Sequence, residues 1–147
     1  MAKTQRLLPL AGLAMIFCAI SAWGQTKTMH ADIPFPFHVA DKHFDAGDYE
    51  VIVGYPSPHT FTVTSFATRE GALGFFWDAK TRDSSALQPR LVFTKYGRDE
   101  YFLSEIWHPW ASSSMKLPRS KQEVVTSKLV AGVRPEKVVI WAALRLP

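Results

Sequence analysis

Beyond Thr28 the chain alternates between short hydrophobic runs and clusters of turn residues, a pattern typical of β-strands. In the run at 31–39, ADIPFPFHV, every second residue is apolar: Ile33, Phe35, Phe37 and Val39. Pro34 and Pro36 both fall on the other parity, so their missing N–H groups lie on one side of the strand. We therefore predict an edge strand over 31–39.

Further runs follow at intervals of about 10–15 residues. After a break at Ala46-Gly47, the positions 49, 51, 53 and 55 form one face of a second strand. The runs HTFTVTSF and ALGFFWDAK predict two more strands, and KVVIWAALRL near the end predicts a last one, with Val138, Ile140, Ala142 and Leu144 on one side.

The segment LVFTKYGRDEYFLSEIW at 91–107 predicts a β-hairpin. If 97–100 is the loop, Tyr96 lies opposite Tyr101, and the alternation then assigns each residue to a face. One face would hold Leu91, Phe93, Phe102 and Ile106. The other would hold Val92, Thr94, Tyr96, Tyr101, Leu103, Glu105 and Trp107.

One helix is predicted, over 121–131. Ser120 followed by Glu123 has the spacing of a capping box, and Gly132 is a suitable stop. The fold class that follows is all-β, mostly an antiparallel meander closed as a small barrel or folded as a sandwich, with one helix in the C-terminal region.

The first 24 residues have the layout of a secretory signal peptide. Lys3 and Arg6 precede an apolar run from Leu7 to Ala22 that is shorter than the roughly 20 residues a spanning helix needs, and cleavage is predicted after Gly24. Residues 25–147 are then a single exported β-rich domain with no transmembrane segment. The one cysteine, Cys18, leaves with the signal, so a periplasmic or extracellular address is reached without disulfides.

Removal of Lys3 and Arg6 lowers the formal net charge from +4 to +2. The remaining charges are interspersed, with no basic stripe among stacking aromatics, so a nucleic-acid partner is not expected.

Three segments together carry a resemblance: IPFPFHV at 33–39 with FDAGDYEV at 44–51, LVFTKYGRDEYFLSEIW at 91–107, and the helix start at 120–123. The chain resembles a family of short exported proteins common in acidobacterial-type genomes. Asp45 departs from that pattern, which has proline before Ala-Gly. The resemblance implies export and a compact β domain, and it carries no catalytic residue.

Candidate chemistry is sparse. His38 and His43 lie five residues apart across a turn and are weak candidates for a metal site, but closely spaced paired ligands are missing and no cofactor is expected. Ser104, Glu105 and His108 suggest a triad. Along a regular strand, however, Ser104 and Glu105 point to opposite faces, and Ser104 lies about 13 Å from His108.

The aromatic end of the hairpin is the best candidate for a binding site. Exposed Trp and Tyr rings beside charged groups are suited to stack on a carbohydrate or another planar ligand. The candidate ligand-binding residues are Tyr96, Tyr101, Glu105, Trp107, His108 and Trp110. Glu105 could equally be held in a cross-strand pair with Arg90 or a lysine, and Trp110 could fold back over the end of the barrel.

Three functions remain open. The first is a non-catalytic exported β domain of the cell envelope that binds a glycan or a small apolar molecule. The second is a small hydrolase or isomerase that uses Glu105 or a His-Asp pair in a barrel pocket. The third is a structural protein that assembles with an envelope protein through the edge strand at 31–39.

Overall fold

A computed structural model describes residues 27–79, 88–109, 111 and 113–145. The regular secondary structure of the described residues is β-strand except for one helix, as predicted. The strands are β1 (Lys27–Ile33), β2 (Phe37–Val39), β3 (Lys42–Phe44), β4 (Gly47–Val53), β5 (Thr60–Ser65), β6 (Gly71–Phe75), β7 (Trp77–Ala79), β8 (Arg90–Tyr96), β9 (Glu100–Trp107), β10 (Ser114–Lys116), β11 (Glu136–Trp141) and β12 (Ala143–Leu144), and the helix is α1 (Lys121–Leu129).

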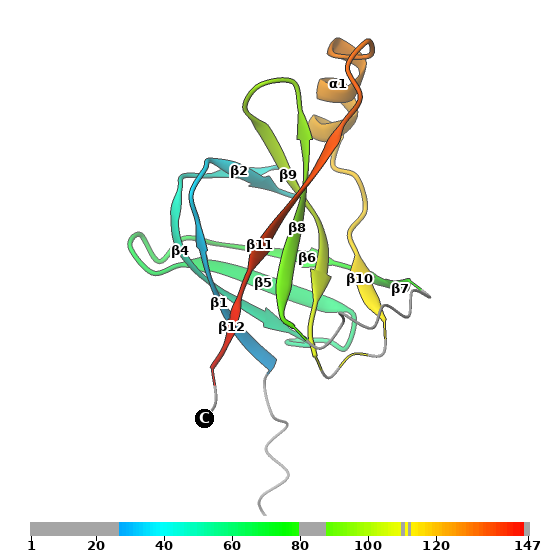
Figure 1. Ribbon diagram of the computed structural model, residues 1–147. Helices are drawn as coiled ribbons and strands as arrows, with labels where there is room; N and C mark the ends of the chain where they lie inside the picture. Colours follow the sequence, from blue (N-terminus) through cyan, green and yellow to red (C-terminus); the bar gives the residue numbers. More distant parts are fainter. Residues whose placement is uncertain (1–26, 80–87, 110, 112, 146–147) are drawn as a thin grey trace, which may run out of the picture.

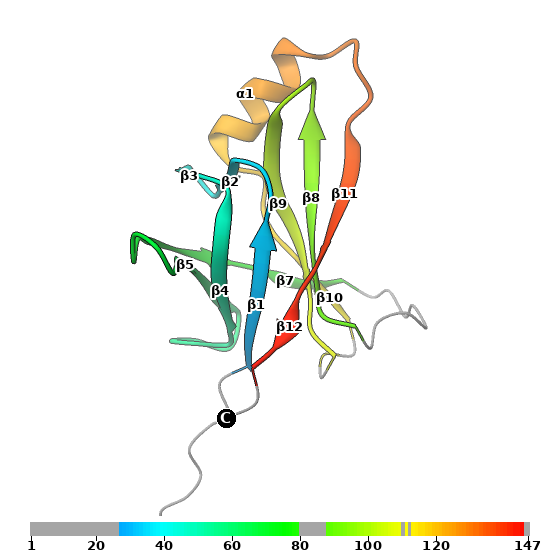
Figure 2. The same ribbon diagram turned by 60° about the vertical axis from the view of Figure 1, so that its left-hand side comes forward.

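The strands form two sheets that are joined to each other along both side edges (Figures 1 and 2). The first has the order β12-β1-β4-β5-β6 and the second the order β11-β8-β9-β10-β7, with β2 and β3 attached to β9. The β6–β7 and β11–β12 segments each run from one sheet into the other, interrupted only at Phe76 and Ala142. The antiparallel pairings therefore form a ring around the core, which is a barrel-like arrangement.

The single edge strand predicted over 31–39 is wrong in two respects. The chain leaves the sheet at 34–36, because Pro34 and Pro36 cannot donate to a ladder, and β2 then continues separately. Nor is β1 an edge, since it pairs with β4 along its length and with β12 at Met29 and His30. The alternation itself is confirmed: Ile33, Phe37 and Val39 are fully buried.

The predicted hairpin is confirmed, but its register near the turn is wrong by one residue. The turn has three residues, with Gly97 at φ +63°, so Tyr96 pairs with Glu100 and Lys95 with Tyr101. A bulge at Ser104 then restores the predicted pairing, as Leu91 opposite Ile106. As a result Leu103 lies in the core between the sheets, and Phe102 lies on the opposite face, buried against Tyr96 and His38, the reverse of the prediction.

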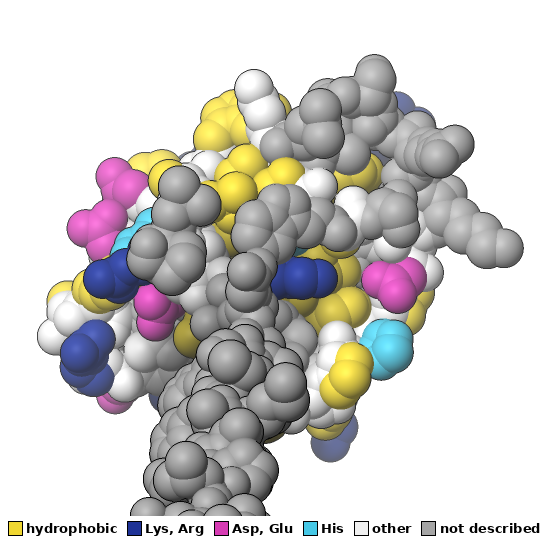
Figure 3. Space-filling model, turned by 90° about the horizontal axis from the view of Figure 1, so that it is seen from below, with side chains coloured by type: hydrophobic (Ala, Val, Ile, Leu, Met, Phe, Trp, Pro, Cys, Tyr) yellow, Lys and Arg dark blue, Asp and Glu magenta, His cyan; other side chains and the backbone are white. Residues whose placement is uncertain are grey.

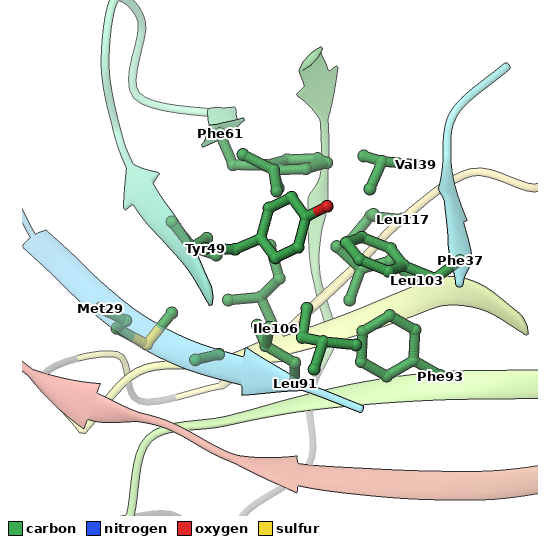
Figure 4. Packing of buried hydrophobic residues seen from close by; sticks show 14 of the residues in the cluster. Met29, Phe37, Val39, Tyr49, Phe61, Leu91, Phe93, Leu103, Ile106 and Leu117 are labelled. Carbon is green, nitrogen blue, oxygen red and sulfur yellow. The ribbon is translucent and has the colours of Figure 1, made fainter. Parts of the chain in front are cut away.

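The core lies between the two sheets, where aromatic and branched side chains from both meet (Figure 4). Phe37 contacts Tyr49 and Phe93 edge-on, at ring-centroid distances of 4.9 and 5.4 Å. The predicted inward face of β4 is confirmed for Tyr49, Val51 and Val53. Tyr55 was assigned to the same face, but it lies in the following turn and is exposed. The interior of the barrel is thus filled by side chains.

The helix begins as predicted and ends two residues earlier, at Leu129. The Ser120 hydroxyl accepts a hydrogen bond from the backbone N–H of Glu123 at 3.0 Å, which caps the first turn. The Glu123 carboxylate does not complete the capping box, because it accepts a hydrogen bond from Tyr96 of β8 instead. This contact ties the helix to one end of the second sheet (Figure 1).

Among the described residues, no helix is long and apolar enough to cross a bilayer. The predicted signal peptide, residues 1–24, lies outside the described part of the chain.

Candidate functional site

The outer face of the second sheet carries three rows of side chains, set by the register of its strands. Trp141, Arg90 and Trp107 form the first row. Val139, Val92, Glu105, Lys116 and Trp77 form the second, across all five strands. Lys137, Thr94 and Phe102 form the third. These rows place apolar rings at both sides of a charged centre.

Glu105 and Lys137 form that centre. The Lys137 ammonium lies 3.7 Å from Glu105 Oε1 and donates to Thr94 Oγ1 at 3.0 Å and to Ser104 Oγ at 3.1 Å. The other oxygen, Glu105 Oε2, accepts from the Trp107 indole at 3.3 Å. The two charges are therefore held in position by neutral donors and acceptors, across the intervening strand β8. Pairing of Glu105 with a lysine, one of the two expectations for this residue, is confirmed.

The expectation that Ser104 and Glu105 face opposite ways is wrong. The bulge gives β9 one extra residue here, so both side chains reach the same face and both contact Lys137. The Ser104 hydroxyl donates to the Val92 carbonyl at 3.0 Å, so its proton is engaged with the backbone. Lys137 donates to the same hydroxyl at 3.1 Å, so the arrangement fixes a polar surface.

A hollow of about 370 Å³ opens on the tryptophan side of the centre. The Arg90 guanidinium lies over the Trp107 ring at 4.2 Å and 5.7 Å from the Trp141 ring. Trp107 is buried, whereas Trp141 is 57% exposed. The hollow thus combines a rigid cation–π layer with one accessible indole face.

A larger hollow of about 550 Å³ opens on the helix side and shares Glu105 and Lys137 with the first. Its far wall is formed by three residues, of which Tyr96 and Glu123 are buried and Arg119 is exposed. The Tyr96 hydroxyl donates to Glu123 Oε1 at 3.0 Å, and Arg119 lies 3.3 Å from Tyr96 and 3.7 Å from Glu123. Burial and the Glu123 carboxylate raise the pKa of Tyr96, so its hydroxyl stays protonated. Trp77, half-exposed, and Lys116 line the same hollow.

The sequence-predicted residues divide between these hollows and other parts of the molecule. Tyr96, Glu105 and Trp107 line the hollows. Tyr101 lies on the inner side of the sheet, stacked on Phe35 at 3.9 Å. His108 is buried, and burial together with Lys27 lowers its pKa to about 4. Trp110 lies outside the described residues.

The two histidines proposed for a metal do lie together. His38 and His43 are cross-strand neighbours with ring centroids 4.8 Å apart, and His38 Nε2 lies 3.1 Å from Glu100 Oε2. His38 also stacks on Phe102. Within the described part of the chain, no group of three or more His, Cys, Asp or Glu side chains is arranged to hold a metal ion.

Sequence reasoning missed most of the residues that complete the hollows: Trp77, Lys116, Arg119, Glu123, Lys137 and Trp141. They come from β7, β10, the helix region and β11, which only the tertiary fold brings beside the hairpin. One signal was available: in KVVIWAALRL the inward positions are apolar, so Trp141 falls on the outward parity. A tryptophan on the solvent side of a strand indicates a contact surface.

No protein-family model, curated protein or solved structure matches this chain.

Proposed function

We propose that the protein is an exported, non-catalytic β domain of the cell envelope that binds an acidic carbohydrate on the outer face of its second sheet. The proposal rests on the way the outward side chains of this face are arranged in rows across the strands. Two accessible indoles, Trp141 and Trp77, flank the Glu105–Lys137 centre, and the surface between them combines hydrogen-bonding side chains with the exposed Val139.

The spacing of the aromatic groups favours an extended ligand. β11 and β7 are separated by four inter-strand spacings, about 19 Å along the sheet. A chain of sugar rings could stack on one indole at each end, while its hydroxyls would meet Thr94, Ser104 and Lys137 between them. Stacking on indoles with polar groups around the rim is a common way to bind such ligands.

The charge of the two hollows favours an acidic ligand. Their described lining contains four cations, Arg90, Lys116, Arg119 and Lys137, and two carboxylates, Glu105 and Glu123. Each carboxylate already lies beside a cation, Lys137 or Arg119. A ligand carboxylate or sulfate would therefore meet a local excess of positive charge.

Binding is preferred to catalysis because the carboxylates are committed to other contacts. The two oxygens of Glu105 face Lys137 and Trp107, and Glu123 is buried against Tyr96 and Arg119. In the His-Asp pairs, His43–Asp45 and His59–Asp78, the paired atoms lie 4.0 Å apart on exposed side chains, and none of the four residues lines either hollow.

The test is an array of neutral and uronic-acid oligosaccharides probed with wild type and with Trp141→Ala. Leu73→Ala is the matched control, because Leu73 is 51% exposed on β6 and lies outside both hollows. We expect acidic oligosaccharides to bind wild type and the control equally, and to bind Trp141→Ala at least tenfold more weakly. Equal binding by all three proteins, or none by any, would contradict the proposal.

Export is tested separately by fractionation of expressing cells and by the intact mass of the product. The proposal expects a product that begins at Gln25 in the exported fraction. A full-length chain retained in the cytoplasm would refute export without affecting the carbohydrate test.

A further inference from the structure

We propose that α1 docks the protein onto an anionic lipid surface. The inference is independent of the carbohydrate proposal, because it rests on the side of the helix that faces away from the sheet.

The helix packs on the sheet with its polar side. Its buried residues are Glu123 and Thr126. On the opposite side, Lys121, Val125, Lys128 and Leu129 follow the spacing i, i+4, i+7, i+8 that aligns residues along one face. All four are exposed, with Val125 at 51% and Leu129 at 81%. Val133, just beyond the helix, is 55% exposed.

Helix formation does not require these apolar residues. Valine is a mediocre helix former, and lysine or glutamate would serve as well as leucine at an exposed position. Apolar side chains that are scattered singly over a surface need no explanation, but here two lie on consecutive turns of one helix face, beside two lysines. Exposed apolar side chains can enter the boundary between headgroups and acyl chains, while lysines beside them meet anionic headgroups.

The charges around this face are one-sided. From 119 to 135 the only acidic residue is Glu123, which is buried and lies beside Arg119. Within the described residues, Lys121, Lys128 and Arg134 have no acidic partner within salt-bridge distance.

The turn between β8 and β9 lies beside Val130, and its charges do not outweigh the excess of basic residues around the helix. Arg98 and Asp99 carry opposite charges, so the turn adds one negative charge, that of Glu100, whereas the segment 119–135 carries four cations and one carboxylate. A negatively charged surface therefore complements this end of the molecule.

The helix is also placed so that a flat surface can reach it. It stands at one end of the molecule, beside the tips of β8 and β9, while β12 and the start of β1 lie at the other end (Figures 1 and 2). Seen from that other end, hydrophobic side chains are visible as well, but Lys and Arg are interspersed with Asp and Glu (Figure 3). The surface at that end therefore carries charges of both signs.

The experiment is co-sedimentation of the exported chain with vesicles of phosphatidylcholine alone and of phosphatidylcholine with one-quarter phosphatidylglycerol. Two variants alter the helix face: Val125→Gln with Leu129→Gln, and Lys121→Gln with Lys128→Gln. Leu73→Gln is the control for an exposed apolar residue elsewhere. Because all these positions are exposed, circular dichroism should show unchanged folding.

We expect wild type and the control to bind the anionic vesicles and not the neutral ones, more weakly at high salt. Loss of the two lysines should weaken binding about 25-fold, from roughly fivefold for each charge. Loss of the two apolar residues should weaken it about tenfold.

Three results would overturn the proposal. The first is no sedimentation of wild type with anionic vesicles, and the second is undiminished binding by the apolar variant. The third is a concentration-dependent doubling of the mass in solution that Leu129→Gln abolishes, because a second copy of the chain would then cover the helix face.

Discussion

At the scale of single residues, Glu105 shows how the fold assigns a carboxylate to a surface. It lies on a strand between apolar neighbours, and its charge is accommodated by Lys137 at 3.7 Å and by the Trp107 indole at 3.3 Å. A partly exposed ion pair of this kind adds little to the stability of the fold, so its main effect is to hold the side chains around it in position. It holds a lysine, an indole and a carboxylate in fixed relation at the junction of the two hollows.

His108 should make the stability of the fold depend on pH. Burial and Lys27 lower its pKa from the ordinary 6.5 to about 4, so the unfolded chain binds a proton in a range where the folded chain does not. Stability is therefore complete above about pH 6.5 and falls as the pH drops towards 4. Between pH 7 and pH 5 this residue should cost on the order of 2 kcal/mol of unfolding free energy.

The measurement is urea unfolding of wild type, His108→Gln and the exposed-site control His43→Gln at both pH values. We expect His108→Gln alone to lose most of the difference between pH 7 and pH 5. If all three proteins show the same difference, His108 is not the group responsible.

Gly74 should not tolerate a methyl group. A Cβ at this position would lie 2.4 Å from the ring of Phe61, which is fully buried and cannot move aside. Gly74→Ala should lower the unfolding free energy by about 1–3 kcal/mol. Gly132→Ala, whose Cβ meets nothing within 4 Å, should leave it unchanged or slightly higher. Thermal unfolding compares the two, and equal melting temperatures would disprove the close contact.

At the scale of elements, the helix depends on its first turn. It has nine residues and buries only polar side chains, so its apolar packing contributes little, and the Ser120 cap matters accordingly. Ser120→Ala should cost about 1 kcal/mol, measured by urea unfolding, whereas Lys121→Ala at the exposed next position should cost little. A cost for Ser120→Ala no greater than that for Lys121→Ala would show that the cap is dispensable.

The elements also show what could be read from the sequence. The alternation of apolar and polar residues correctly predicted which side chains of β4 and of β11–β12 face the core. Side chains alternate between the two faces of a strand whichever strand it pairs with. The same alternation assigned residues 101–103 to the wrong faces. A three-residue turn and a one-residue bulge, which depend on backbone geometry, shift the register between them by one residue and so exchange the two faces. The prolines at 34 and 36 were predicted to lie in an edge strand, but they interrupt the strand between β1 and β2 instead.

At the scale of the whole molecule, the candidate site is a product of the tertiary fold. Lys137 and Glu105 are brought together by β11, which returns after the helix to pair with β8, and Trp77 arrives from the strand that links the two sheets. From sequence, the hairpin could be identified as the likeliest region by its aromatics alone. Its neighbours could not, since no local pattern specifies which strands pair.

The most direct test of the central claim is nuclear magnetic resonance of the isotope-labelled protein titrated with a uronic-acid oligosaccharide. The claim that the outer face of the second sheet binds an acidic carbohydrate predicts shifts of the indole N–H signals of Trp141 and Trp77 and of the backbone amides at 104–107 and 137–141. Shifts confined to other parts of the chain, or none at saturating oligosaccharide, would contradict it.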